Sequence, residues 1–375
     1  MHQTVNRMEL HKGIDPGSRY SKALLEKILL EDIEHLSFME VCGTHTMAIS
    51  RFGIRRALAG KIELHSGPGC PVCVTDDAEI DLAIRMAGEF KATLCTFGDM
   101  MRVPGSSSSL LMEKAMGSRV VVVYSPLYAL DIARQEDRQI VFLAVGFETT
   151  VPSIALTIMR TKQEGVKNLS FLSLNKVIPP ALNFLCENRE VRIDGFILPG
   201  HVSTVIGVKP YEFIPRRFGI PCVISGFEQA DILSSILMLM DQNKRGEPEV
   251  RDQYFRGVRR EGNLKAQEVI EEVFEPCDSR WRGIGMLPLS GLKLKDKYKD
   301  FDAMERFNVK PQVVYSSQVK RACKCGEVLI ARIKPPQCPL FAVSCDPEHP
   351  VGPCMVSTEG TCAAYYKYER AGSLV

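Results

Sequence analysis

Short apolar runs alternate with segments of helical spacing from residue 37 to residue 242. Each run ends in a glycine-rich or polar turn, which is typical of a strand that leads into a helix. Runs such as 120–123 and 141–145 lack polar alternation, as expected of parallel strands that helices cover on both faces. This pattern predicts eight strands, at 38–42, 62–65, 92–97, 119–124, 140–145, 169–174, 195–198 and 221–225.

The eight strands predict two α/β domains, each a doubly wound, Rossmann-like parallel sheet of four consecutive strands. The polar segment 134–139 marks the seam, so the first domain spans 36–138 and the second 139–245. Residues 1–35 and 246–375 are predicted to form a third, smaller and irregular domain, whose cofactor is argued below from its cysteines. An amphipathic helix at 21–30 is expected to pack on that domain, and a further helix is predicted at 264–274.

Composition describes a globular protein and excludes several classes of function. The 375 residues are 45% hydrophobic and 25% charged, which is enough for two or three hydrophobic cores. A net charge of +2 gives no electrostatic basis for nucleic-acid binding. No apolar run is long enough to span a membrane, and residues 1–15 lack a signal-peptide core, so a cytoplasmic protein is expected.

Cysteine is unusually frequent, with thirteen residues in total and six in the last 53 positions. A reducing compartment disfavours structural disulfides, so these thiols indicate metal binding or redox chemistry. A zinc or iron-sulfur centre takes four ligands, which leaves two thiols for redox work. The tail lacks paired C-x-x-C knuckles, so its spacing favours iron-sulfur over zinc without choosing the ligands among Cys323, Cys325, Cys338, Cys345, Cys354 and Cys362.

The other candidate residues follow predicted strands, where ligands of α/β sheets gather. Cys42 ends the first strand at a turn into a helix, where backbone donors are expected to lower the thiol pKa, with His45 three residues on. An inert buried cysteine is the alternative. Cys70 and Cys73 form a C-x-x-C unit that is a redox pair or half of a zinc site, and the lack of a nearby second pair favours redox.

Three further strand-end residues, Asp99, Glu148 and His201, could act as general acid or base, or donate and accept supporting hydrogen bonds. Helix capping is the alternative for each of them. The cysteines without a partner at useful spacing are interpreted as packing residues; they are Cys95, Cys186, Cys222 and Cys277.

Five motifs together resemble the HypD family of [NiFe]-hydrogenase maturation factors, and they extend over nearly the whole chain. They are Met39–Thr46 (MEVCGTHT), Ser66–Thr75 (SGPGCPVCVT), Thr96–Gly105 (TFGDMMRVPG), Pro199–Ser203 (PGHVS) and Cys354–Ala364 (CMVSTEGTCAA). One departure from the family pattern is Gln229, which stands where a proline is expected after Glu228 and weakens the case for a role of that loop.

The resemblance implies a scaffold on which an iron with two cyanides and one carbon monoxide is assembled before transfer to the hydrogenase large subunit. Cys42 would hold this iron together with the N-terminal cysteine of the small chaperone HypC, while HypE supplies cyanide from a thiocyanate. His45 would lie beside the iron, and Cys70 with Cys73 would form a dithiol that cycles during cyanide attachment. A monomer acting in transient complexes is expected.

The same resemblance implies a [4Fe-4S] cluster in the tail, like that of ferredoxin:thioredoxin reductase. Its ligands would be Cys323, Cys338, Cys345 and Cys362, with Cys325 and Cys354 as a redox pair, although Cys354 and Cys362 could exchange roles. Two other functions compete with the scaffold. One is an iron-sulfur disulfide reductase acting on a protein substrate, and the other is a protein-assembly platform with a purely structural cluster.

Overall fold

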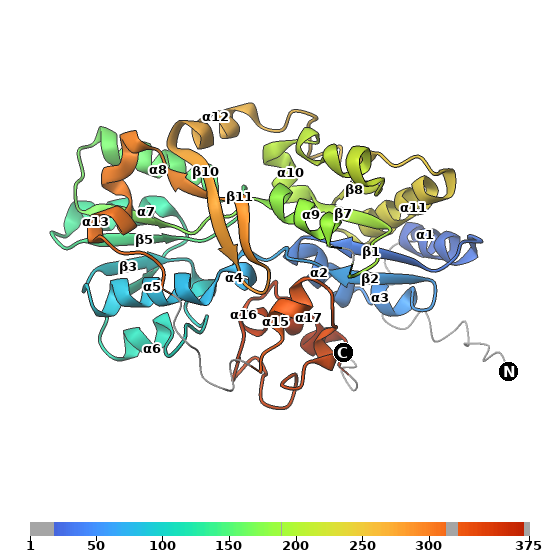
Figure 1. Cartoon of the computed structure of the whole chain (residues 1–375), viewed down its shortest axis with the longest axis horizontal. Helices are drawn as coiled ribbons and strands as arrows, with labels where there is room; N and C mark the ends of the chain where they lie inside the picture. The colour runs from blue at the N-terminus through green and yellow to red at the C-terminus, as the bar shows by residue number, and fades with distance from the viewer. Residues whose placement is uncertain (1–18, 189, 313–321, 371–375) are drawn as a thin grey trace.

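Two parallel sheets form the framework of the chain, seen side by side in Figure 1. The computed structural model describes residues 19–188, 190–312 and 322–370, so the signal-peptide prediction for residues 1–15 lies outside it. The first sheet has the order β2-β1-β7-β8-β9, with β1 (Leu36–Glu40), β2 (Ile62–Ser66), β7 (Gly195–Pro199), β8 (Cys222–Ser225) and β9 (Val250–Asp252). The second has the order β4-β3-β5-β6, with β3 (Thr93–Thr96), β4 (Val120–Val122), β5 (Ile140–Ala144) and β6 (Leu169–Ser173).

All eight predicted strands are present, but their division into two consecutive sets of four is wrong. The chain leaves the first sheet after β2, builds the whole second sheet with β3 to β6, and returns to the first sheet at β7. The boundaries at 138/139 and 245/246 therefore do not coincide with the sheets, since β9 also joins the first sheet. Local strand and helix periodicity carries no information about which parallel strands become neighbours.

Helices connect the parallel strands in both sheets, as a parallel arrangement requires. The connections of the first sheet are α2 (Gly43–Arg51) and α3 (Ile54–Ala57), α10 (Gly200–Ile206) with η2 (Lys209–Tyr211) and η3 (Ile214–Phe218), and α11 (Gln229–Arg245). Those of the second are η1 (Gly98–Met100) and α6 (Leu110–Ala115), α7 (Pro126–Gln135) and α8 (Val151–Gln163). The chain crosses between sheets through α4 (Pro71–Val74) and α5 (Asp77–Gly88), and returns through α9 (Ile178–Glu187). None of the described helices is long and apolar enough to cross a membrane.

An antiparallel hairpin that the sequence analysis did not predict lies between the sheets in Figure 1. It consists of β10 (Phe274–Trp281) and β11 (Gly285–Leu294), and it follows α12 (Leu264–Val273), which packs on α8. Trp281 is fully buried, and its indole N–H donates to Oγ of Ser290 at 2.9 Å. The buried Lys176 joins the hairpin to α5, because its Nζ lies 3.0 Å from Oε2 of Glu79 and 2.9 Å from Oγ of Ser279.

The N-terminal helix α1 (Arg19–Leu30) packs on the first sheet unit, contrary to the prediction that it packs on the irregular domain. Its buried Leu25 and Ile28 share a hydrophobic cluster with Leu233 and Ile236 of α11. The amphipathic pattern identified the buried face of this helix, but not the surface that covers it.

The C-terminal tail follows η4 (Asp296–Phe301) and α13 (Ala303–Phe307), and lies beneath the junction of the two sheet units in Figure 1. Its short elements are α15 (Cys325–Leu329), η5 (Pro335–Gln337), α16 (Pro353–Val356) and α17 (Thr361–Tyr368). Helix α17 packs on α2, and α16 packs on α4. The tail therefore touches the helix after Cys42 and the helix that holds the C-x-x-C unit.

Candidate functional site: a cysteine cavity and a thiol-rich tail

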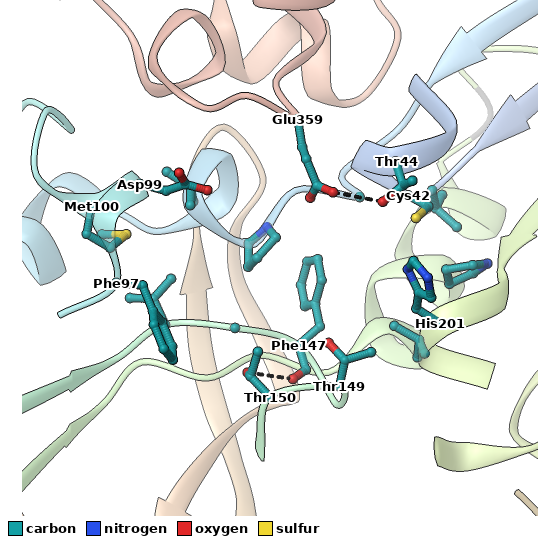
Figure 2. A pocket seen from close by; sticks show the side chains of 18 residues that line it. Cys42, Thr44, Phe97, Asp99, Met100, Phe147, Thr149, Thr150, His201 and Glu359 are labelled. Carbon is teal, nitrogen blue, oxygen red and sulfur yellow. Dashed lines mark hydrogen bonds between the residues drawn. The ribbon is translucent and has the colours of Figure 1, made fainter. Parts of the chain in front are cut away.

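A cavity of about 270 Å³ lies at the carboxyl ends of strands from both sheets (Figure 2). Its walls come from the segments after β1, β2, β3, β5 and β7, and from one residue of the tail. Parallel strands direct their following loops to one edge of the sheet, so the interleaved topology brings two such edges together. The side chains considered below that line the cavity are Cys42, Thr44, Asp99, Phe147, Thr149, His201 and Glu359.

Cys42 lies at the turn between β1 and α2, as the sequence predicted, but its thiol is not acidic. Its backbone N–H donates to Oε2 of Glu40 at 2.9 Å, and the chain at Gly69 approaches so closely that a Cβ there would lie 2.1 Å from the Cys42 nitrogen. Burial raises the pKa of Cys42 to about 12. The expected lowering of this pKa is wrong, because the backbone N–H groups of His45 and Thr44 act in that direction but are outweighed by loss of solvent.

Glu40 is a buried carboxyl beside Cys42 that sequence reasoning did not select. Its Oε1 accepts the hydroxyl of Thr46, and burial raises its pKa to about 7 against the hydrogen bonds of Ser66 and Thr46. The guanidinium of Arg55 donates to Oγ of Ser66 at 3.2 Å and pairs with Glu369 at the end of α17. Hydrogen bonds therefore link the Cys42 turn to the last helix of the tail.

Glu359 is the tail residue at the cavity, and sequence analysis gave it no role. Oγ1 of Thr44 donates to Oε1 of Glu359 at 2.7 Å, as Figure 2 shows. Gly43 is needed for this contact, because a Cβ there would lie 2.5 Å from Cβ of Glu359. The charge of Glu359 also raises the pKa of Cys42. Its place inside the motif Cys354–Ala364 was the available sequence signal.

Two histidines and a phenylalanine stack beside the cavity. The ring of Phe227 lies 4.8 Å from that of His45 and 3.9 Å from that of His201, measured between centroids. His45 is buried behind the wall; its Nε2 lies 2.9 Å from the carbonyl oxygen of Gly226, and its Nδ1 has no hydrogen-bond partner among the described residues. Burial lowers the pKa of His45 to about 4, so the ring is neutral and Nε2 donates to that carbonyl. Gly226 and Phe227, the first two residues of the loop that ends at Gln229, therefore position the ring of His45.

His201 lines the cavity, and burial also lowers its pKa. Asp99 lines the opposite part of the wall, in η1 after β3 (Figure 2). Glu148 differs, because its neighbours Phe147 and Thr149 line the cavity while its own carboxylate accepts the N–H of Ile178, the first residue of α9, at 2.9 Å. Burial raises the pKa of Glu148 to about 7, and its Oε2 has no hydrogen-bond partner among the described residues.

Cys70 and Cys73 form a disulfide at the start of α4, with their Cα atoms 5.3 Å apart. The tail covers this pair directly. Oγ of Ser357 lies 3.3 Å from Sγ of Cys70, and the carbonyl oxygen of Pro353 lies 4.0 Å from Sγ of Cys73. The predicted C-x-x-C unit is thus in contact with the segment that carries Cys354.

Four tail cysteines interact through their sulfurs. Hydrogen bonds from Cys325 and Cys354 lower the pKa of Cys362 to about 6, while a hydrogen bond with Cys325 raises the pKa of Cys323. A glycine is required at 352, because a Cβ there would lie 2.7 Å from the sulfurs of both Cys323 and Cys325.

The predicted ligand set stays a prediction. Cys345 is held apart from the sulfur hydrogen bonds, with its Sγ accepting the N–H of Val351 at 3.3 Å, and Cys338 follows η5. No group of three or more Cys, His, Asp or Glu side chains in residues 19–188, 190–312 and 322–370 has the geometry to hold a metal ion. The donor chemistry nevertheless suits iron-sulfur binding, since thiolates are the usual ligands of such clusters.

Comparison with known proteins gives one consistent result. The family model HypD, described as "Hydrogenase formation hypA family", matches residues 19–369. The chain is 46% identical over 346 residues to the hydrogenase maturation factor HypD of Cupriavidus necator, covering 90% of each chain. It is 43% identical over 357 residues to HypD of Escherichia coli, covering 92% of this chain and 94% of that protein. The chain therefore belongs to the HypD family of hydrogenase maturation factors.

Proposed function

We propose that this protein is the scaffold on which the Fe(CN)₂CO unit of [NiFe]-hydrogenases is assembled before transfer to the hydrogenase large subunit. The observation that carries the proposal is the position of Cys42, the one cysteine among the described residues that line the cavity. A single protein thiolate leaves the other coordination positions of an iron cargo free for diatomic ligands. A second thiolate would come from the N-terminal cysteine of a HypC-type partner.

The wall around Cys42 suits such a cargo. Phe147 supplies apolar surface, while Thr149 and His201 supply polar groups that can donate hydrogen bonds to cyanide nitrogens. Soft thiolate ligation suits iron that carries cyanide and carbon monoxide. Because burial keeps Cys42 protonated, iron binding must displace the thiol proton, and the neutral imidazole of His201 in the cavity wall can receive it.

Cyanide attachment requires a reductant, and the dithiols of this chain are suited to supply it. In the proposed reaction a thiocyanate on a HypE-type donor reacts with a dithiol: R–SCN plus two thiols gives R–SH, HCN and a disulfide. The dithiol holds the two electrons that this step consumes, and it leaves the step as a disulfide. The Cys70–Cys73 pair lies next to the cavity walls at Gly69 and Pro71, so it is the candidate for the step nearest the iron.

The tail would restore the dithiol. We assign Cys323, Cys338, Cys345 and Cys362 as the residues that would hold a [4Fe-4S] cluster, which would supply single electrons when bound. Cys325 and Cys354 would pass electron pairs by thiol exchange to Cys70 and Cys73. Two contacts support this route: the hydrogen bond between Cys325 and Cys354, and the packing of Pro353 and Ser357 on the C-x-x-C unit. Such chemistry fits a cytoplasmic protein, where thiols are kept reduced.

Infrared spectroscopy tests the scaffold directly. The full-length protein is purified without oxygen after co-expression with its HypC-type partner, and wild type is compared with Cys42→Ala in the region where metal-bound cyanide and carbon monoxide absorb. Cys186→Ala is the matched control, because Cys186 and Cys42 are both 8% exposed and Cys186 lies in an apolar part of α9.

Bands in wild type and in the control but not in Cys42→Ala are expected. Bands that persist in Cys42→Ala would exclude this cysteine as the iron ligand. Absence of bands from all three proteins, with an iron-sulfur spectrum and dithiol turnover retained, would favour the disulfide reductase instead.

A further inference from the structure

Ser357 connects the C-x-x-C unit to the wall of the Cys42 cavity. It follows α16 in the tail and is 1% exposed. Its Oγ lies 3.3 Å from Sγ of Cys70 and also accepts the backbone N–H of Glu359 at 3.2 Å. One buried hydroxyl therefore contacts both the dithiol and the glutamate of the cavity wall.

The hydrogen of this hydroxyl is assigned by its partners. A hydroxyl has one hydrogen and two lone pairs, and the N–H of Glu359 occupies a lone pair. A disulfide sulfur or a thiolate can only accept, so the Ser357 O–H donates to Cys70. The backbone N–H of Cys73 donates to the same sulfur at 3.2 Å. Cys70 thus faces two donors, which favour a negative sulfur.

Cys73 has the opposite surroundings. It is fully buried, and its Sγ lies 4.0 Å from the carbonyl oxygen of Pro353, a group that only accepts hydrogen bonds. A carbonyl near a sulfur favours the protonated thiol over the thiolate. The two sulfurs of one dithiol are therefore placed in environments of opposite preference by residues 353–357 of the tail.

We propose that Ser357 is a positioning residue that sets the polarity of the dithiol, so that reduction leaves a thiolate on Cys70 and a thiol on Cys73. The S–S bond breaks, two electrons and one proton enter, and a dithiol reductant is oxidised to its own disulfide. The proposal rests on the proposed function only in taking Cys70 and Cys73 as a working redox pair.

The same hydroxyl is connected by hydrogen bonds to the cavity wall. Ser357 accepts the backbone N–H of Glu359, and the side chain of Glu359 accepts from Thr44, two residues after Cys42. The dithiol and the turn after Cys42 are therefore joined through the loop 357–359.

The test measures the reduction equilibrium of the Cys70–Cys73 couple in the isolated full-length protein. The protein is equilibrated in dithiothreitol redox buffers, alkylated and analysed by peptide mass spectrometry. Loss of a hydrogen bond to a charged sulfur in Ser357→Ala should make the disulfide about tenfold harder to reduce, a shift of about 30 mV to more negative potential. Ser357→Thr keeps a hydroxyl and should stay within about threefold of wild type. The exposed neighbour supplies the control, Thr358→Ala, which should match wild type.

An unchanged equilibrium in folded Ser357→Ala would overturn the proposal. If that variant does not fold, alkylation of the reduced wild-type protein decides, because Cys70 must react before Cys73 and the reverse order contradicts the assignment. The reduction equilibrium and the order of alkylation are both independent of iron loading. A failure of the infrared experiment would therefore remove the scaffold and leave the polarity of the dithiol standing.

Discussion

Buried cysteines of the cavity and of the tail differ in the direction in which their surroundings shift the thiol pKa. At the cavity one buried thiol, Cys42, has its pKa raised to about 12 by loss of solvent. In the tail Cys362 is equally buried, at 8% exposure for both, but hydrogen bonds from Cys325 and Cys354 lower its pKa to about 6. The difference shows that burial alone does not determine the state of a cysteine. What decides is whether donors replace the lost water.

The two states suit two tasks. In the proposed scaffold, a protonated and isolated Cys42 would stay unreactive until an iron cargo displaces its proton, which would protect the thiol from oxidation and alkylation. Thiols that donate to one another already include a thiolate, which is the form that binds metal or attacks a disulfide.

The largest difference is expected in alkylation of the reduced, metal-free protein at pH 7.5. Hydrogen bonds lower the pKa of Cys362 while burial raises that of Cys42, so Cys362 has the larger thiolate fraction and should react with iodoacetamide far faster than Cys42. Their equal exposure makes them a matched pair within one chain. Similar rates, read by peptide mass spectrometry, would remove the contrast.

Removing one sulfur of the dithiol should leave the tail unchanged but prevent ligand assembly at the cavity. Cys70→Ala is expected to retain the iron-sulfur absorbance of the tail while the infrared bands of cyanide-bearing iron fall by about a hundredfold or more, because no two-electron donor remains near the cavity. Cys95→Ala, a buried cysteine in β3 of the second sheet, is the control. Normal ligand assembly in Cys70→Ala would disprove the proposed route.

Burial should also control the carboxyl groups on the cavity side. The pKa of Glu148 is raised from 4.5 to about 7, so the folded state holds its proton more tightly than the unfolded state. This stabilisation is complete below pH 4.5 and is lost as the pH rises through about 7. Glu148→Gln should reduce the decrease in the free energy of unfolding between pH 5 and pH 8. At pH 8 the variant should be more stable than wild type by up to roughly 3 kcal/mol.

Urea unfolding at pH 5 and pH 8 measures this effect. Glu89→Gln, at an exposed carboxylate that ends α5, should keep the wild-type dependence on pH. If the free energy of unfolding of Glu148→Gln depends on pH as in wild type, the carboxyl of Glu148 is solvated and burial does not set its pKa.

The smallest effect is expected from Glu359 in the cavity wall, on the alkylation rate of Cys42. Glu359→Gln removes a negative charge that raises the pKa of Cys42, while its amide oxygen can still accept from Thr44. Alkylation of Cys42 should accelerate about threefold, as expected for loss of one partly screened charge. Thr358→Ala should have no effect. A rate that falls in Glu359→Gln would show that the glutamate acts as a base toward the thiol rather than as a repelling charge.

Much of the site could be predicted from local sequence. Cys42, Asp99 and His201 were placed at strand ends and do line the cavity, because apolar runs without polar alternation mark buried parallel strands and their following turns hold the ligand-binding loops. Glu148 was placed at the correct turn, but its carboxylate caps α9, since a strand-end position does not specify the direction of a side chain.

Contacts between distant segments were missed for a different reason. Phe227 stacks on two histidines, and Glu359 accepts from Thr44, which lies 315 positions away in the sequence. Local periodicity predicts neither contact. The hairpin β10–β11 was also missed, because proline, glycine and a bulge between Cys277 and Ser279 interrupt its alternation.

The sequence by itself determined the parallel strands, the chemistry at their ends and the family, since hydrophobic period and motif spacing are local properties of the chain. Tertiary structure alone decided that β7 and β8 join β1 and β2, that two sheet edges enclose one cavity, and that the tail covers the dithiol. It also decided the state of Cys42, because a pKa depends on how much water is lost and on which donors replace it, and both are known only after distant segments pack together.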